Sequence, residues 1–202
     1  MNKTSVLWVS GWAIPPEELA QLAHEALPHL SHYVIHPDPQ AMTKALASKA
    51  GILGGFSFGA HLLLSLIDPR PRILLAPFVD LKKESCLGGA IPTTQLRQQL
   101  RWLKRDPQAA IADFRKRMEA GSPSNEEKHH LDHLAWGLEK MLSPSLPPVL
   151  LSPGSVAVAG NLDPLLDAAV LQQALPQLHR IDSGHQLKPL LAAVANLRQN
   201  KD

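Results

Sequence analysis

The segment Gly54-Gly55-Phe56-Ser57-Phe58-Gly59-Ala60 decides which fold is predicted for this 202-residue chain. It follows the apolar residues 51–53 and precedes the largely apolar run 61–67, which indicates a strand, a tight turn and a helix. The pattern Gly55-x-Ser57-x-Gly59 matches the nucleophile elbow, a sharp turn that exposes a serine hydroxyl at the end of a strand. Larger side chains at the two flanking positions would collide in so tight a turn, which favours glycine there. The helix that follows would direct its free N–H groups toward an oxyanion beside Ser57.

The alternative is a glycine-rich turn that contains a serine by chance. With 12 Gly in 202 residues, this five-residue pattern is expected by chance roughly 0.05 times in the chain. The decision therefore depends on whether the chain supplies partners for Ser57.

Composition limits the class of protein. Hydrophobic residues make up 45% and charged residues 19% of the chain, as in one globular domain with a substantial core. A net charge of only +2 gives no support for a nucleic-acid partner. No apolar run has the length of a membrane span, and the run after Lys3 is too short for a signal peptide. Cys86 is the single cysteine, which excludes an internal disulfide and agrees with a reducing compartment, so we expect a cytoplasmic protein. We also expect a monomer without a cofactor or metal.

Strand and helix patterns alternate along most of the chain. Short apolar runs predict six strands, at residues 5–9, 32–36, 51–56, 72–78, 156–160 and 177–181. Helical patterns lie between and after them, at residues 16–27, 40–49, 58–67, 165–175 and 186–198. This alternation predicts an α/β fold with a mostly parallel sheet of about six strands.

The alternation stops between the fourth and fifth strands. Three amphipathic helical segments replace it, at residues 94–104, 107–119 and 125–141, and a group of prolines marks the return to the main fold. We therefore expect a core of residues 1–79 and 147–202 and a helical lid formed by residues 80–146.

Partners for Ser57 follow the last two predicted strands, at the sheet edge where active groups collect. A serine hydroxyl needs a base, and an imidazole held by a carboxylate is suited to that role. We assign His185 as general base and then acid, and Asp163 as the group that orients it. The order Ser, Asp, His is that of α/β-hydrolases. Asp167, one turn into a helix, and Asp182, three residues before the histidine, are weaker candidates.

Two backbone amides are the expected oxyanion hole. One belongs to Phe58, the residue after the nucleophile, and the other to Trp12, in the loop after the first strand. The indole ring of Trp12 is either a core aromatic or part of the pocket wall, and both can hold because the backbone makes the hole.

At these residues the sequence resembles the α/β-hydrolase superfamily over nearly its full length. More narrowly, it resembles the esterases that demethylate the pimeloyl-acyl-carrier-protein methyl ester in biotin synthesis. The stretches that carry the resemblance are Leu7-Trp8-Val9-Ser10-Gly11-Trp12, Gly55-Phe56-Ser57-Phe58-Gly59, Gly160-Asn161-Leu162-Asp163, Ser183-Gly184-His185 and, in the lid, residues 103–107 and 112–118. The sequence departs from the family at Ser10, where histidine is usual. We also expect it to lack the two antiparallel strands that usually open the fold.

A stripe of arginines on the lid agrees with a carrier-protein substrate. Arg97, Arg101 and Arg105 recur at i, i+4 and i+8 and so share one helix face, with Lys104 and residues 115–117 adding positive charge nearby. In the resembling family, lid arginines dock the acidic acyl carrier protein, and the resemblance implies that role for these three. The alternative is a solvated helix face.

Three further features of the sequence are weaker candidates for a function. Trp12, Phe58, Trp102 and Phe114 are candidates to line an apolar acyl slot, although the last two fit a plain lid core equally well. His129, His130 and His133 have the spacing of metal ligands, but nothing in the sequence completes a site. Cys86 has no helix and base beside it that would activate a thiolate.

The sequence therefore predicts a serine carboxylesterase that hydrolyses the methyl ester of pimeloyl-acyl-carrier protein through an acyl-enzyme. The alternatives are a general short-chain carboxylesterase or thioesterase, and a binding protein of this fold without catalysis.

Overall fold

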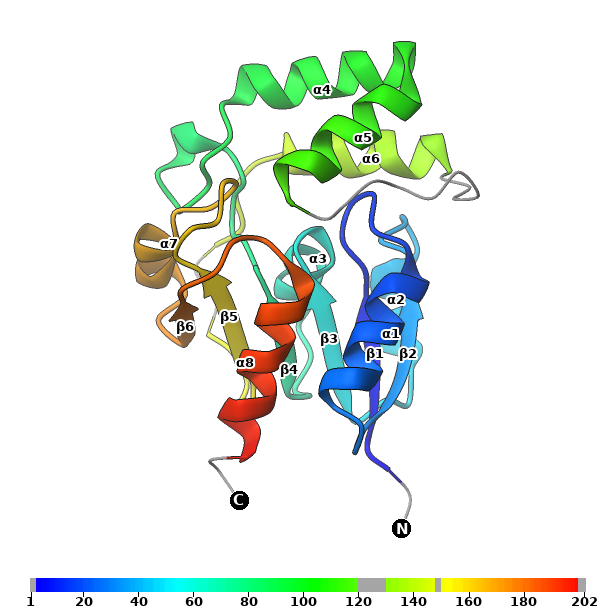
Figure 1. Cartoon of the computed structure of the whole chain (residues 1–202), viewed down its shortest axis with the longest axis vertical. Coiled ribbons are helices and arrows are strands. Elements are labelled where there is room, and N and C mark those ends of the chain that lie inside the picture. The colour runs from blue at the N-terminus through cyan, green and yellow to red at the C-terminus, as the bar shows by residue number, and fades with distance from the viewer. Residues whose placement is uncertain (1–2, 120–129, 148–149, 200–202) are drawn as a thin grey trace.

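The structure is a computed structural model that describes residues 3–119, 130–147 and 150–199 (Figure 1). Its six strands are β1 (Ser5–Val9), β2 (Ser31–Ile35), β3 (Ile52–Phe56), β4 (Arg72–Leu75), β5 (Val156–Gly160) and β6 (Leu178–Ile181). They form one sheet in the order β2-β1-β3-β4-β5-β6. Every strand pair within it is parallel, so the predicted α/β sheet is confirmed.

Helices cover both faces of this sheet because parallel strands need crossover connections. The covering helices are α1 (Pro16–Ala26), α2 (Ala41–Ala47), α3 (Phe58–Leu64), α7 (Ala168–Ala174) and α8 (Leu187–Gln199). Helix α1 packs beside α8 on one face, and α2 packs beside α3 on the other (Figure 1). Strands β1, β3, β4 and β5 are thereby buried on both sides, which explains their continuous apolar runs.

Several element boundaries differ from the sequence prediction by one to three residues, and for two of them the structure shows the reason. Strand β4 ends at Leu75 rather than at residue 78, because Ala76 has a positive φ of 45° that no strand accommodates. Helix α7 begins at Ala168 rather than at residue 165, because the side chain of Asp167 accepts hydrogen bonds from two amides of the first turn and caps the helix there.

The segment between β4 and β5 forms a separate helical layer over the carboxyl ends of the strands (Figure 1). It contains a short 3-10 turn, η1 (Lys83–Ser85), and the helices α4 (Thr93–Arg105), α5 (Pro107–Arg117) and α6 (Leu131–Met141). Helix α4 packs on both α5 and α6. The third predicted lid helix was expected from residue 125, and residues 125–129 lie outside the described part of the chain.

The two ends of this lid lie side by side. The amide of Leu146 donates to the carbonyl of Val79 over 3.2 Å, and the ammonium group of Lys82 donates to the carbonyl of Ser143. The buried carboxylate of Asp80 accepts from the hydroxyl of Ser145 and from the Lys82 amide. The two stems of the lid are therefore adjacent to one another.

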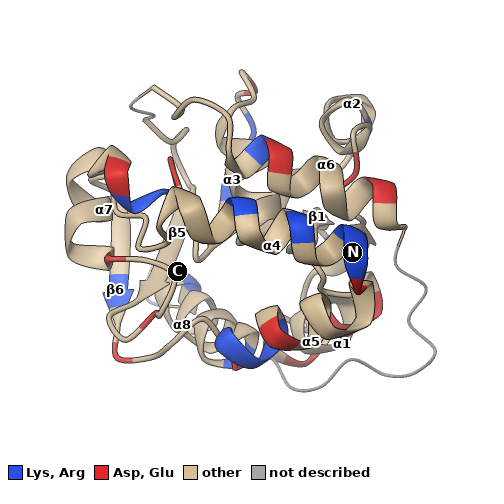
Figure 2. Cartoon of the chain, turned by 90° about the horizontal axis from the view of Figure 1, so that it is seen from above, with Lys and Arg blue, Asp and Glu red and all other residues tan. Residues whose placement is uncertain are grey.

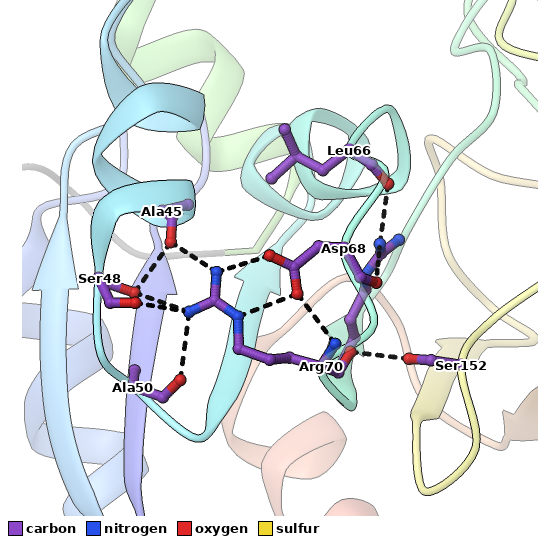
Figure 3. A network of polar contacts seen from close by, with 8 residues as sticks. Ala45, Ser48, Ala50, Leu66, Asp68, Arg70 and Ser152 are labelled. Atoms are coloured by element: carbon purple, nitrogen blue, oxygen red, sulfur yellow. Dashed lines mark hydrogen bonds and ion pairs between the residues drawn. The ribbon is translucent and has the colours of Figure 1, made fainter.

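At the amino end of the sheet, on the side away from the lid, Arg70 is the centre of a network of hydrogen bonds (Figure 3). Its guanidinium binds the carboxylate of Asp68 in a bidentate manner, with N···O distances of 2.9 and 2.6 Å. The remaining N–H groups donate to the carbonyls of Ala45, Ser48 and Ala50. These bonds hold the carboxyl end of α2 and the start of β3 to the start of β4. The hydrogen bonds from Arg70 also hold the pKa of Asp68 below its usual value.

Candidate active site

Ser57 lies at the turn between β3 and α3 and has a strained backbone, with φ of 52° and ψ of −113°. The flanking glycines are required for steric reasons. A Cβ atom at Gly55 would lie 2.7 Å from the backbone of Ala60, and one at Gly59 would lie 2.1 Å from the carbonyl oxygen of Val9. The first clash lies inside the turn, as expected. The second shows that Gly59 also lets α3 approach the end of β1.

The structure brings together the three residues predicted as a triad. His185 Nε2 lies 2.9 Å from Ser57 Oγ, and His185 Nδ1 lies 2.6 Å from an oxygen of Asp163. The second oxygen of Asp163 accepts from the Leu165 amide over 2.8 Å. The side chains of His185 and Asp163 are fully buried, and Ser57 is 6% exposed. Each residue follows the carboxyl end of a different strand: β3, β5 and β6.

This geometry defines the direction of each hydrogen bond. An ionised carboxylate only accepts, so the Nδ1–H group of His185 donates the hydrogen bond to Asp163. In the neutral imidazole Nε2 is then the acceptor, and the hydroxyl of Ser57 donates to it. The serine proton therefore already points at the base that would remove it.

The two weaker carboxylate candidates have other partners. Asp167 accepts from the amides of Ala169 and Val170 and caps α7. Asp182 accepts from the side-chain amide of Asn161 over 2.9 Å. Among the three carboxylates considered, Asp163 is the one that binds His185.

The amide of Phe58, the first residue of α3, belongs to the N–H groups that have no acceptor within a helix. It lies directly after Ser57, as the expected oxyanion hole requires. The ring of Phe58 is buried between α3 and α6, where it packs edge-on against Trp136 at a centroid distance of 5.7 Å.

The second expected oxyanion amide, that of Trp12, lies in a tight turn after β1. The Ile14 amide donates to the carbonyl of Gly11 over 3.2 Å and closes the turn, in which Ala13 has a positive φ of 56°. Ser10, at the position where the resembling family has histidine, is buried and donates from its hydroxyl to the carbonyl of Ile14 over 2.8 Å.

The indole of Trp12 connects this turn to the lid. Its Nε1–H donates to the carbonyl of Leu134 in α6 over 2.8 Å, and its ring packs edge-on against Phe114 of α5. A Cβ atom at Gly137 would lie 2.7 Å from the Trp12 ring, so α6 is in close contact with the turn. Phe114 is thus buried between lid and core, while Trp102 is half-buried within the lid.

His61 was not singled out by the sequence analysis, although it lies one turn after Ser57 on α3. Its Nδ1–H donates to the carbonyl of Phe78 over 2.9 Å, and its ring stacks on Phe58 and Phe78. Burial is the main reason that the pKa of His61 lies below its usual value. A histidine on the nucleophile helix is the only sequence signal that could have indicated it.

The three arginines of the predicted stripe lie on the outer side of the lid. Arg97, Arg101 and Arg105 are exposed on α4, along which Lys and Arg positions recur in the view from above (Figure 2). Within the described residues none of the three has a hydrogen bond or an ion pair.

Two other lid arginines do not add to that surface charge, contrary to the sequence interpretation. Arg115 is buried and binds Glu18 of α1 over 2.9 Å. Arg117 binds Asp113 and the side chain of Gln99, both over 2.7 Å. Each faces an internal partner because α5 packs against α4 and the core.

The histidines with metal-ligand spacing and Cys86 form no metal or catalytic site in the described residues. His130 and His133 lie with their ring centroids 5.1 Å apart, and His129 is outside the described residues. In the described part of the chain no group of three or more His, Cys, Asp or Glu residues could hold a metal ion. Cys86 is exposed after η1.

No helix in the described residues is long and apolar enough to cross a membrane.

No protein-family model and no curated protein sequence matches the chain. Solved structures match along nearly its whole length. The bottromycin epimerase BotH is similar with a TM-score of 0.62 and 15% identity, over 99% of this chain and 91% of that chain. RedJ, a thioesterase from the prodiginine biosynthetic pathway in Streptomyces coelicolor, is similar with a TM-score of 0.55 and 13% identity, over 95% and 84%. The N-formylmaleamic acid deformylase Nfo from Pseudomonas putida is similar with a TM-score of 0.53 and 15% identity, over 99% and 92%. The chain thus has an α/β-hydrolase-like fold. At sequence identities this low, the similarity shows a shared fold and not a shared activity.

Proposed function

We propose that the protein is a serine hydrolase of acyl substrates, in which Ser57 is the nucleophile, His185 the general base and Asp163 the group that orients it. The observation that carries this proposal is the continuous hydrogen-bonded chain from Ser57 Oγ through the imidazole to the buried carboxylate. The strained backbone of Ser57 adds support, because such strain is found where a function requires it.

The reaction follows from the same geometry. Oγ of Ser57 attacks the acyl carbonyl while Nε2 of His185 takes the hydroxyl proton. Asp163 stabilises the imidazolium, and the amides of Phe58 and Trp12 bind the oxyanion. The imidazolium then gives its proton to the leaving alcohol or thiol, which leaves an acyl group on the serine. A water molecule activated by His185 releases the acid and restores the hydroxyl.

For the substrate we propose the methyl ester of pimeloyl-acyl-carrier protein, with methanol as the leaving group. Two observations support this choice: the sequence resemblance given above, and the exposed arginines on α4 that have no partner in the described residues. An acidic carrier protein would be steered toward such a surface by complementary charge.

A thioester is the second candidate substrate. RedJ, which has the same fold, is a thioesterase, and the triad described above could release a thiol as readily as an alcohol. A binding protein without catalysis is the least consistent alternative, because a hydrogen-bonded Ser, His and Asp set has no purpose in binding alone.

One pair of measurements tests catalysis and the substrate together. A fluorophosphonate probe should label the wild type and leave Ser57→Ala unlabelled. Methyl-pimeloyl-acyl-carrier protein, followed by intact-mass spectrometry, should lose the mass of one CH2 group with the wild type and stay intact with the variant. Folded wild-type protein that the probe leaves unlabelled would contradict the hydrolase proposal. Labelling without demethylation, together with cleavage of an acyl thioester, would keep the triad and replace the substrate.

A further inference from the structure

One lid residue is bonded to the turn that carries the Trp12 amide. Arg115 of α5 is nearly fully buried, with 4% of its side chain exposed. Its Nη1–H donates to the carbonyl of Ala13 over 3.1 Å, and its Nη2–H donates to Glu18 of α1 over 2.9 Å. The guanidinium therefore reaches from the lid to the floor of the site, across 102 positions of sequence.

The bond to Ala13 begins a relay of hydrogen bonds through two peptide groups. The carbonyl of Ala13 and the amide of Ile14 belong to the same peptide, and that amide donates to the carbonyl of Gly11. The carbonyl of Gly11 in turn shares its peptide with the amide of Trp12. The positive charge of Arg115 thus polarises the Ala13–Ile14 peptide and, through it, the Gly11–Trp12 peptide, which carries the Trp12 N–H. The same hydrogen bonds fix the orientation of both peptides.

The turn needs such support because its conformation is unfavourable by itself. Ala13 has a positive φ of 56°, a region that side chains other than glycine rarely adopt and that costs about 1–3 kcal/mol. Rotation about the N–Cα bond of Ala13 would relieve this strain. It would also move the Ala13 carbonyl and the Ile14 amide away from Arg115 and Gly11, so these two hydrogen bonds oppose the rotation. The Ser10 hydroxyl fixes the next carbonyl, that of Ile14.

We propose that Arg115 is a positioning residue of the oxyanion hole, which orients and polarises the Trp12 amide through the Ala13 and Gly11 carbonyls. The inference rests on the proposed hydrolase function. It assigns to the lid a second task besides covering the site: the active geometry of the floor depends on a residue that the lid supplies.

The test compares Arg115→Met and Arg115→Lys with the control variant Glu18→Gln. The control removes the charge of the second partner and leaves the bond to Ala13 in place. For each protein we would measure kcat and KM for p-nitrophenyl butyrate, the thermal unfolding midpoint, and Ki for a matched pair of inhibitors. A trifluoromethyl ketone adds to the serine and forms an oxyanion, whereas the corresponding alcohol binds without forming one.

Arg115→Met should lower kcat by about 10- to 100-fold and leave KM within about twofold, because misplacement of an oxyanion donor affects the transition state more than the ground state. Its Ki for the trifluoromethyl ketone should rise by the same factor, and its Ki for the alcohol should not change. Arg115→Lys, which keeps the charge and can reach Ala13 alone, should recover part of the loss. Glu18→Gln should stay within about twofold of the wild type in every constant.

Other outcomes separate the two proposals. If Arg115→Met and Arg115→Lys melt at a lower temperature but keep the wild-type kcat and trifluoromethyl ketone Ki, Arg115 is only a structural anchor and the inference is wrong. If Arg115→Met does not fold, the ratio of the two inhibitor constants in Arg115→Lys decides. If the folded wild type neither reacts with a fluorophosphonate nor cleaves the ester, the proposed function fails and takes this inference with it.

Discussion

The two ends of the β-sheet bury polar groups in different ways. At the amino end, Arg70 and the carboxylate of Asp68 bind one another, and the other Arg70 donors go to backbone carbonyls (Figure 3). At the carboxyl end, Ser57, His185 and Asp163 bind mainly to one another. The first arrangement connects elements of the backbone, and the second aligns side chains for a reaction.

Backbone strain is distributed in the same unequal way. Among the described core residues, the non-glycine residues with positive φ are Ala13, Ser57 and Ala76, which follow β1, β3 and β4 at their carboxyl ends. At the amino end of the sheet, the residue with a positive φ in the turn before β5 is Gly154, and glycine adopts this conformation without strain. Strain is therefore present where the proposed chemistry takes place and is avoided where the sheet is only held together.

The largest effect should come from a change that affects only the carboxyl end. In Asp163→Asn the side chain keeps its size but no longer holds the Nδ1–H tautomer of His185. We expect kcat for an aryl ester to fall by about 10³–10⁴-fold, with the free energy of unfolding changed by about 1 kcal/mol or less. Steady-state kinetics and urea unfolding measure the two quantities. A fall in stability as large as the fall in kcat would mean that Asp163 is mainly structural.

A change at the amino end should do the reverse. Arg70→Met removes the guanidinium from the buried Asp68 carboxylate and from the carbonyls of Ala45, Ser48 and Ala50, so the free energy of unfolding should fall by about 3 kcal/mol. The activity of the folded fraction should not change. Arg97→Met makes the same chemical change on the exposed face of α4 and should alter the free energy of unfolding by no more than about 0.5 kcal/mol. Equal effects of the two variants on urea unfolding would refute the structural role of the network.

His61 lies between these two cases, because it is buried on the nucleophile helix but has no part in the triad. Its folded pKa lies below the ordinary value of about 6.5, so the unfolded chain binds the proton first as the pH falls. The stability that comes from keeping His61 neutral in the folded state is fully present above pH 6.5. Below that pH the free energy of unfolding should fall by up to about 1.4 kcal/mol per pH unit, until the folded pKa is reached.

His61→Gln keeps a donor for the Phe78 carbonyl and removes the titration. Its free energy of unfolding should therefore depend less on pH between 6.5 and 5 than that of the wild type. Urea unfolding at several pH values measures the difference, with His179→Gln, at an exposed position on β6, as the matched control. Parallel curves for His61→Gln and the wild type would show that protonation of His61 does not oppose folding.

The smallest effect concerns the face of the lid that is remote from both ends of the sheet. Replacing Arg97, Arg101 and Arg105 by Ala should leave kcat/KM for an aryl ester within about twofold, because these side chains have no partner in the described residues. KM for the carrier-bound methyl ester should rise, and the rise should shrink as salt is added. Equal effects on both substrates would remove the docking role.

The sequence predicted the positions of residues at the carboxyl end of the sheet better than those of residues in the lid. Gly55, Ser57 and Gly59 are set by contacts within a few residues or with the adjacent strand, so their spacing predicted the strand, tight turn and helix that the structure shows. Asp163 and His185 could be assigned because the ends of parallel strands meet at one edge. In contrast, Arg115 was grouped with the surface charges of its helix, since its burial depends on Ala13 and Glu18, far away in the sequence. The early end of β4 was missed because sequence alone does not reveal the positive φ of Ala76.

The adjacent stems of the lid, joined by the bond between the Leu146 amide and the Val79 carbonyl, have a consequence for engineering. A segment whose two stems are adjacent is suited to transplantation, because a cap from another enzyme of this fold could be spliced in without moving a strand. If Arg115 acts as proposed, such a chimera would inherit a requirement along with its new specificity. Its cap would have to present a cation to the carbonyl of Ala13, and a cap without one would give an enzyme that binds the new substrate but turns it over slowly.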